Sequence, residues 1–305
     1  MTPERVEEEK PLTSALPVSV KSDDGKLATP IDFEILHTCI DIEDNNRTIR
    51  ILTAKKEIKY LTVSHRIPNV HQAGLPPLPT GSWNYSQIKL SRNSNTPAFK
   101  KAKTLTFPSV TPLWHPDRIE YTSLHTAPTS SRTIKRGVEL VTHPELNIPC
   151  IAKFAPMPWH TVLLTLETRN YHILHKHNIN FPHDRPIGPA FLGHILEHGR
   201  AIGFLLEHVA DARPATIADL DICREELGRL HALGYIHADV NRYNFLVARG
   251  SKKATLMDFA SMRSAEGAEH YKNELEQLKM ELGDEDSGKG KPDGDTVEWK
   301  YGAHL

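Results

Sequence analysis

The feature that most constrains this chain is a polar stretch, His-Ala-Asp-Val-Asn-Arg-Tyr-Asn at positions 237–244, enclosed by apolar segments. The preceding segment, 219–236, has the spacing of an amphipathic helix. The following segments, 245–247 and 255–260, predict two short strands joined by a turn, the second of which leads into Asp258. Carboxylate and amide oxygens are hard ligands of the kind that Mg²⁺ binds. The alternative, that these polar residues only cap a turn, requires three ordered elements to coincide by chance.

The upstream half offers a lysine and an acid that could orient it. The run 148–155 reads Ile-Pro-Cys-Ile-Ala-Lys-Phe-Ala and predicts a strand that carries Lys153. The next segment, 159–179, has helical periodicity, and its one acid, Glu167, comes 14 residues after Lys153. We expect these two side chains to form an ion pair within about 4 Å, against the alternative that Glu167 lies on a solvated helix face. The residues expected near one face of this helix are Leu163, Leu166, Asn170 and Ile173 or Leu174.

Two further apolar runs predict a hairpin downstream of that helix. They are 190–197 and 200–209, and the pair between them, His-Gly at 198–199, favours a tight turn. The segment 211–214, Asp-Ala-Arg-Pro, then breaks the second strand. Such a break suits a connector between two lobes, although a simple hairpin without a ligand has the same pattern.

Taken in order, these motifs resemble the protein-kinase-like superfamily. The stretch 237–244 matches its H-x-D-x-x-x-x-N catalytic loop, Ile-Ala-Lys at 151–153 matches the end of its V-A-I-K strand, and Asp-Phe at 258–259 matches its metal-binding turn. The region from about 119 to 282 is most similar to compact atypical members: RIO-type and Bud-type kinases, and aminoglycoside and choline phosphotransferases. It also resembles kinase-like proteins of filamentous fungi, some of which carry an α-galactosidase label that the positions of the acids do not support.

The resemblance implies an α+β fold, namely a bilobal protein-kinase-like fold with a reduced C-lobe and a β-rich N-terminal extension. It implies ATP as a partner and Mg²⁺ as a cofactor, with the γ-phosphoryl group passing to a hydroxyl of a protein or a small molecule. Asp239 would accept the hydroxyl proton, and Arg242 would help with the phosphate charge. His237 would brace the loop by hydrogen bonds, and Asn244 with Asp258 would hold the metal ion.

The same resemblance assigns the nucleotide contacts. Lys153 would hold the α- and β-phosphates, and Glu167 would be its ion-pair partner. Glu207 and Val209, at the end of the second predicted hairpin strand, would lie at the hinge between the lobes, where their backbone groups would face adenine.

The chain departs from the kinase pattern in several places. No G-x-G-x-x-G precedes Lys153, and the segment 130–149 holds one glycine, Gly137, so a phosphate-covering loop must use other backbone or be absent. Asn241 replaces the lysine that follows the catalytic aspartate, and Asp-Phe-Gly is Asp-Phe-Ala. After it, one helix-forming run remains, 266–282, which leaves little of a substrate-binding C-lobe. A pseudokinase or scaffold that binds nucleotide weakly, or a pure interaction protein, is therefore the alternative to an enzyme.

Composition restricts the class of partner. The chain has 37 lysines and arginines against 38 aspartates and glutamates, a formal net charge of −1, which argues against general binding to nucleic acids or membrane surfaces. Its three cysteines are scattered, and no apolar run is long enough for a membrane span. The first ten residues are charged where a signal peptide would be apolar. We therefore expect a cytoplasmic or nuclear protein that is not secreted.

Four regions follow from this composition. Residues 1–30 are polar and are expected to be disordered, and 283–305 are expected to form a disordered tail. Residues 31–118 are expected to form a β-rich extension, with a β-meander to position 63 and a long, irregular, proline-rich stretch after it. Residues 119–282 are expected to form the kinase-like domain.

Two features outside the kinase pattern have simpler interpretations. The helix 159–179 contains His172, His175 and His177, but no carboxylate or cysteine completes a metal site there. The stretch 89–103 is basic and lacks acids, so it could contact phosphate or an acidic partner. A solvated loop is the favoured interpretation there, because aromatic residues are sparse.

Overall fold

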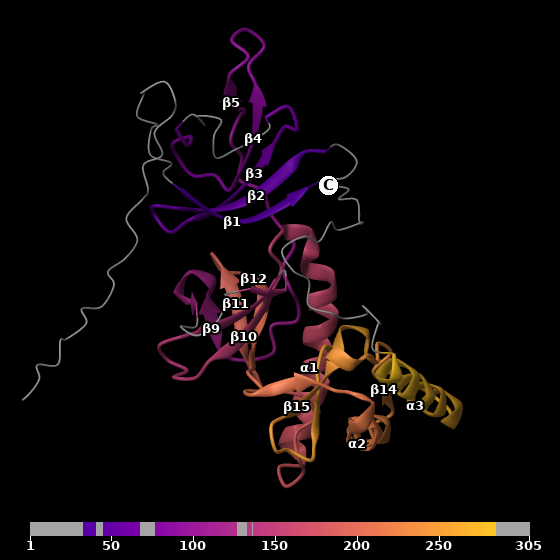
Figure 1. Cartoon of the computed structure of the whole chain (residues 1–305). Helices are drawn as coiled ribbons and strands as arrows, with labels where there is room; N and C mark the ends of the chain where they lie inside the picture. Colours follow the sequence, from indigo (N-terminus) through magenta and orange to yellow (C-terminus); the bar gives the residue numbers. More distant parts are fainter. Residues whose placement is uncertain (1–32, 41–44, 68–76, 127–132, 136, 285–305) are drawn as a thin grey trace, which may run out of the picture.

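The computed structural model describes residues 33–40, 45–67, 77–126, 133–135 and 137–284. They form an α+β structure with several β-sheets and three α-helices (Figure 1). The predicted disorder of residues 1–30, and that of the tail from residue 285 onward, falls outside the described residues. No helix of the described part is long and apolar enough to cross a membrane.

A five-stranded sheet forms the N-terminal part in the order β1-β2-β3-β4-β5. Its first three strands make an antiparallel meander, which confirms the prediction for the region up to position 63. The strands are β1 (Phe33–Ile40), β2 (Arg47–Thr53), β3 (Ile58–Val63), β4 (Tyr85–Leu90) and β5 (Pro97–Phe99).

The prediction that residues 64–118 are irregular is wrong for β4 and β5. Strand β4 runs parallel to β3, and β5 pairs with β4 in the antiparallel sense. The alternation of β4 is hidden in the sequence because Ser86 occupies one of its buried positions, where its hydroxyl donates to the carbonyl of Lys100 (3.0 Å). From the sequence alone, a serine that is buried and hydrogen-bonded cannot be distinguished from a serine in an exposed loop.

A seven-stranded sheet follows, in the order β6-β11-β12-β10-β9-β7, with β8 also paired to β9. The predicted strand around Lys153 and the predicted hairpin are confirmed as β10 and β11–β12. His198 (φ 51°) and Gly199 (φ 79°) form the hairpin turn, with the positive φ values that a two-residue turn favours. The strands are β6 (Arg118–Glu120), β7 (His125–Thr126), β8 (Thr133–Lys135), β9 (Val138–Thr142), β10 (Cys150–Phe154), β11 (Phe191–Glu197) and β12 (Arg200–Glu207).

The long helix α1 (Thr161–Asn180) confirms the predicted helix but buries a different face. Of the residues expected near one face, Leu163 and Leu166 are 56% and 42% exposed, whereas Leu174 is buried. Leucines occur on several sides of this helix, so periodicity alone could not choose the face. The buried residues are Thr161, Leu164, Glu167, Thr168, Tyr171 and Leu174.

The C-terminal part places the polar stretch 237–244 between short strands and two helices. Helix α2 (Leu220–Ala232) precedes it, and α3 (Ala268–Gly283), the single helix expected after Asp258, closes the described chain. One apolar core joins all three helices, through residues such as Leu174, Leu227 and Leu278. The strands here are β13 (Ala212–Pro214), β14 (Tyr235–Ile236), β15 (Phe245–Ala248), β16 (Ala254–Leu256) and β17 (Arg263–Ser264).

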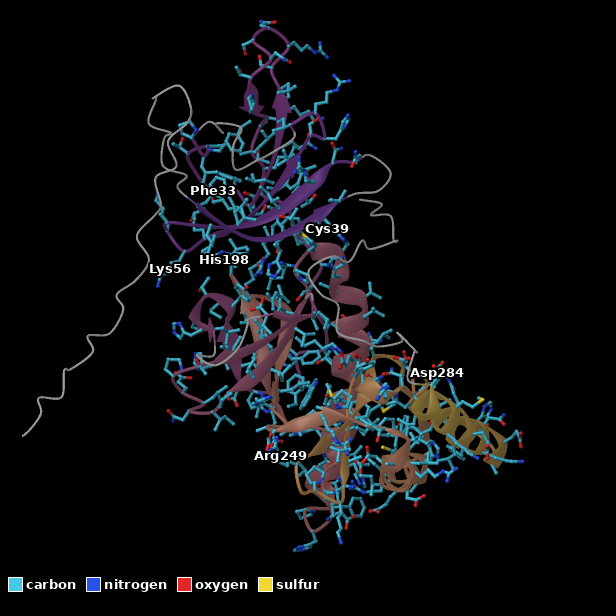
Figure 2. The ribbon with its side chains drawn as sticks, in the orientation of Figure 1. Phe33, Cys39, Lys56, His198, Arg249 and Asp284 are labelled. Atoms are coloured by element: carbon cyan, nitrogen blue, oxygen red, sulfur yellow. The ribbon has the colours of Figure 1, made fainter. Side chains whose placement is uncertain are left out.

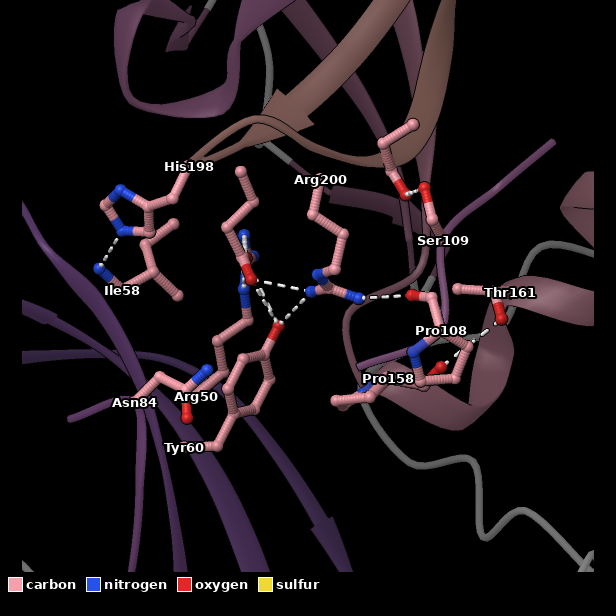
Figure 3. Close-up of polar contacts among 12 residues, drawn as sticks. Arg50, Ile58, Tyr60, Asn84, Pro108, Ser109, Pro158, Thr161, His198 and Arg200 are labelled. Carbon is pink, nitrogen blue, oxygen red and sulfur yellow. Dashed lines mark hydrogen bonds and ion pairs between the residues drawn. The ribbon is translucent and has the colours of Figure 1, made fainter. Parts of the chain in front are cut away.

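A buried polar cluster, which we call the junction, joins the N-terminal sheet to the β11–β12 hairpin. Arg50 of β2 donates from Nε (3.0 Å) and Nη2 (2.7 Å) to Oε2 of Glu197, and the Tyr60 hydroxyl donates to Oε1 (2.9 Å). Arg200 donates to the other side of the cluster, to Glu197 Oε1 (2.6 Å) and to the Tyr60 hydroxyl (3.0 Å). Figure 3 shows Arg50, Tyr60 and Arg200 converging, and Figure 2 labels His198 in the same region. The N-terminal sheet is therefore fixed to the rest of the molecule.

Candidate functional site

Lys153 lies at the centre of the site that the sequence predicts. Its Nζ is 2.6 Å from Oε2 of Glu167 on α1 and donates a hydrogen bond to Oδ1 of Asp258 (2.8 Å). The predicted ion pair between Lys153 and Glu167 is therefore confirmed. These contacts join β10, α1 and the segment after β16, which are far apart in the sequence.

The cluster around Lys153 carries an excess of negative charge. Burial alone would lower the pKa of Lys153, but the carboxylates of Asp258 and Glu167 outweigh it and raise the pKa above its ordinary value. Lys153 is thus a cation at neutral pH that two carboxylates share. A site with one cation between two carboxylates favours a further cation.

Asp258 is held in a strained backbone conformation. Its φ of 64° and ψ of 66° lie in the left-handed region, where a non-glycine residue is uncommon. The segment after it is fixed by α1, because the Asn170 amide donates to the carbonyls of Phe259 (2.6 Å) and Met262 (3.0 Å). Strain of this kind persists where the surroundings determine it, and it is frequent at ligand sites. Asn170 was expected near one face of the helix, but no pattern in the sequence indicates this contact.

The stretch 237–244 folds around hydrogen bonds between its own polar residues. The Asn244 amide donates to the Asp239 carbonyl (2.8 Å) and to its carboxylate oxygen Oδ2 (3.3 Å). Asn241 donates to the same carbonyl (3.2 Å) and accepts from the N–H of Tyr243 (2.9 Å), which caps the short turn that follows. Ala238, just before Asp239, has a φ of 62°. Asp239, the predicted base, and Asn244, a predicted metal ligand, are therefore in direct contact.

His237 ties this stretch to the segment that carries Asp258. It is fully buried, and its Nε2 lies 3.0 Å from the Met257 carbonyl, so this nitrogen carries the hydrogen. The N–H of Met257 donates in turn to the Asn244 carbonyl (3.0 Å). Burial lowers the pKa of His237 and so favours the neutral ring. These contacts are those of the bracing role predicted for His237.

Glu274 of α3 is a residue of this site that sequence reasoning missed. Its Oε1 accepts from the N–H of Ala238 (2.6 Å), and its Oε2 accepts from the N–H of His237 (3.1 Å) and lies 2.7 Å from Nε2 of His231. Burial would raise the pKa of Glu274, but these hydrogen bonds outweigh it and lower the pKa. In the sequence, Glu274 is one of several acids on a helix, and only its burial (5% exposed) distinguishes it.

Three aromatic rings pack edge to face between these parts. The Phe259 ring lies edge-on between His237 (centroids 5.6 Å apart) and Tyr171 of α1 (5.3 Å). The Tyr171 hydroxyl is buried and has no hydrogen-bond partner among the described residues. Burial raises its pKa well above the ordinary value, with further contributions from Glu167 and Asp258. These edge-to-face contacts couple the position of α1 to that of the polar stretch and of Asp258.

The remaining predicted residues lie near the ends of neighbouring elements. Glu207 ends β12, and its N–H donates to the Ala190 carbonyl (2.9 Å), so this N–H is not available to a ligand. Val209 is half-buried, and its N–H has no hydrogen-bond partner within the described part of the chain. Arg242 lies in the turn after Asn241, with its guanidinium 5.9 Å from the Tyr243 ring centroid.

The amide oxygen of Asn244 and the carboxylate of Asp258 are hard oxygen donors of the kind that Mg²⁺ takes. The described residues hold no group of three or more histidines, cysteines or acids arranged to bind a metal ion. Magnesium needs no such group, because one or two protein oxygens suffice when phosphates and water supply the others. Asn244 donates from its amide nitrogen to Asp239, which leaves its amide oxygen for a metal, and Asp258 supplies a carboxylate. His172 and His175 instead pack on Trp114, at centroid distances of 4.9 and 4.8 Å.

Comparison with known proteins gives no further identification. No protein-family model matches the chain, and no curated protein matches it.

Proposed function

We propose that this chain is an ATP-dependent phosphotransferase that moves the γ-phosphoryl group of Mg-ATP to a hydroxyl of a protein or small molecule. The observation that carries the proposal is the position of Lys153, which contacts Glu167 and Asp258 at once. The segment of Asp258 is hydrogen-bonded to the stretch that bears Asp239 and Asn244. A kinase-like site requires a strand lysine, a helix glutamate and an aspartate at the metal, all in contact range.

The order of elements supports a bilobal kinase-like fold. The strand with Lys153 belongs to an antiparallel sheet, the helix with Glu167 follows it, and a hairpin leads from the same sheet toward the second part. The second part is small, with two helices and short strands around the stretch 237–244. A reduced C-lobe of this kind leaves the choice between a protein and a small-molecule acceptor open.

In this proposal each side chain has a defined task. Lys153 binds the α- and β-phosphates, and Glu167 keeps it directed toward them. Asp239 orients the acceptor hydroxyl and takes its proton, while Asn244 holds Asp239 in place. Mg²⁺, when bound by Asn244 and Asp258, neutralises charge on the phosphates.

A nucleotide-binding scaffold without catalysis is the second candidate, favoured by one observation. Gly137, the one glycine before Lys153 that a phosphate-covering loop could use, is fixed on β10 instead: its carbonyl accepts from the N–H of Phe154 (2.8 Å). A Cβ atom at Gly137 would lie 2.4 Å from the Phe154 carbonyl oxygen, so close packing explains this glycine. A scaffold would keep the contacts of Lys153 and lack turnover.

Thermal unfolding with nucleotide tests the proposal. Mg-ATP should raise the melting temperature, because a ligand that binds only the folded state stabilises it by mass action. Asp258→Asn should remove the part of the shift that depends on Mg²⁺, and Lys153→Ala should weaken both ATP binding and turnover. Equal shifts with Mg²⁺ and with a chelator would exclude the metal site. Binding without any transfer of labelled phosphate to lysate proteins or small molecules would favour the scaffold.

A further inference from the structure

The N-terminal sheet has an uneven distribution of charge that the proposed reaction does not use. Between Glu57 and Asp117 the chain has no aspartate or glutamate over 59 residues, but it has seven lysines and arginines. The whole chain has a formal net charge of −1. The rest of the chain therefore carries a net negative charge that balances these cations.

Five of these cations lie on or beside the β4–β5 hairpin. All five are exposed, and within the described residues none of them forms an ion pair with a carboxylate. Figure 1 places this hairpin at the end of the molecule opposite to α2 and α3. The five residues are Lys89, Arg92, Lys100, Lys101 and Lys103.

Strand register brings three of the lysines to one face. Lys89 alternates with Gln87 and Tyr85 on β4; Lys100 donates its N–H to the Gln87 carbonyl (2.8 Å), and Lys103 pairs with Tyr85 across an antiparallel bridge. Paired residues of antiparallel strands point to the same face. We call the surface formed by Lys89, Lys100 and Lys103 the basic hairpin face.

Protection of a sheet edge explains this face only in part. Lysine and proline discourage edge strands from pairing with other chains, and β5, with Pro97 and the adjacent Lys100, is an edge strand. Lys89 lies on β4, which is paired on both sides. Glutamates would also protect an edge, so edge protection does not account for the absence of acids from 58 to 116.

We propose that the basic hairpin face is a docking surface for an acidic protein segment rich in aspartate and glutamate. Its unpaired lysines are complementary to such a segment. A nucleic acid fits less well, because bases stack on exposed aromatic rings. Trp83 is buried, Phe99 packs into the apolar layer of the sheet, and the Tyr85 hydroxyl is hydrogen-bonded to Thr62 (3.2 Å).

Fluorescence anisotropy with a labelled oligoglutamate peptide tests the proposal. The full chain should bind the peptide at low salt and release it as salt rises, since screening weakens exposed charge pairs. The variant K89E/K100E/K103E should bind at least about tenfold more weakly. The neutral variant K89Q/K100Q/K103Q should lose less, and it keeps the test valid if charge reversal disturbs the fold.

The control variant K252E/K272E/K279E makes the same charge change at exposed positions away from the hairpin, and it should bind like the wild type. Equal losses in the two glutamate variants would overturn the proposal, because net charge alone would then explain binding. A single-stranded oligonucleotide of equal charge that binds more tightly through the same lysines would overturn it in favour of a nucleic acid. If the wild type does not bind the peptide and a lysine variant oligomerises, the proposal is overturned. The lysines would then serve only to keep the sheet edge from pairing with other chains. None of these outcomes depends on ATP binding.

Discussion

Two buried clusters of charge in this molecule have opposite balances. In the junction, two arginines, Arg50 and Arg200, share one carboxylate, Glu197, and the Tyr60 hydroxyl completes the hydrogen bonds. In the candidate site, two carboxylates share the one cation of Lys153. Arg50 is fully buried and packs over the Tyr121 ring at 4.0 Å, whereas the side chains of Lys153 and Asp258 are 17% and 21% exposed.

The backbone differs in the same way. Arg50, Glu197 and Arg200 lie within regular strands, while the site contains Ala238 and Asp258 at positive φ. A buried charge that loses its partner is left uncompensated, so a fold is sensitive to the loss of either member of such a cluster. Strained backbone and excess charge of one sign mark a place that a ligand completes. This contrast is what we expect if the junction holds the fold together and the proposed site binds a ligand.

The largest effect should come from removing the carboxylate of the junction. Glu197→Gln leaves the buried guanidinium of Arg50 and the partly buried one of Arg200 without a counter-charge, and it should lower the free energy of unfolding by about 3–5 kcal/mol. Asp258→Asn removes a carboxylate from the site, where negative charge is in excess, and should leave the free energy of unfolding within about 1 kcal/mol of the wild type or raise it. Urea unfolding measures both.

The exposed Glu34→Gln variant controls for loss of one negative charge from the N-terminal sheet. If Asp258→Asn destabilises the fold as much as Glu197→Gln does, the distinction between the two clusters is wrong.

The next largest effect concerns catalysis at Asp239. Asp239→Asn should cut phosphotransfer by roughly 10²-fold or more and leave ATP affinity within a few-fold, because the base acts on the acceptor hydroxyl and not on the nucleotide. Initial rates with labelled ATP and a thermal shift with Mg-ATP separate the two quantities. Asp221→Asn, at an exposed acid of α2, is the matched control. Full activity in Asp239→Asn would remove the catalytic role.

The sequence predicts one cluster and not the other. Lys153, Glu167 and Asp258 follow ordered motifs, and the strand, the helix and the hairpin around them form where periodicity places them. The bond between Arg50 and Glu197 joins residues 147 positions apart. The sequence does not distinguish a buried polar residue from an exposed one. No pattern within β2 or β11 therefore predicts the ion pair between Arg50 and Glu197. The same reason hides Ser86 of β4 and the buried face of α1.

A smaller effect tests whether α3 positions the site. Glu274→Gln replaces one acceptor oxygen by an N–H donor and leaves a buried N–H unpaired, which should cost about 1–3 kcal/mol of stability. Because Ala238 precedes Asp239, kcat should fall while KM for ATP stays nearly constant. Glu276→Gln, exposed on the same helix, is the control. An unchanged kcat would make Glu274 a residue of stability only.

The smallest expected effect is a pH dependence of the free energy of unfolding that comes from His194 and not from the neighbouring junction. His194 of β11 is buried, and its Nε2 accepts from the N–H of His115 (3.3 Å). Burial, with the positive charges of His115 and Arg118, lowers the pKa of His194 from its ordinary 6.5 to about 4. The unfolded chain therefore takes up this proton first as pH falls, so stability present above pH 6.5 should decline toward pH 4.

The junction should not contribute to that decline. Burial would raise the pKa of Glu197, but Arg50 and Arg200 outweigh it and hold the pKa below its ordinary 4.5, so the carboxylate stays ionised from pH 7 to 5. Urea unfolding at pH 7, 6 and 5 should thus show a shallower pH dependence in His194→Gln than in the wild type. The slope should not vanish, because burial also lowers the pKa values of other histidines around Trp114. Parallel curves for His194→Gln and the wild type would mean that His194 is not the group that titrates. The histidines around Trp114 that retain a slope are His115, His172 and His175, and the buried His237, whose pKa is also lowered, adds to it.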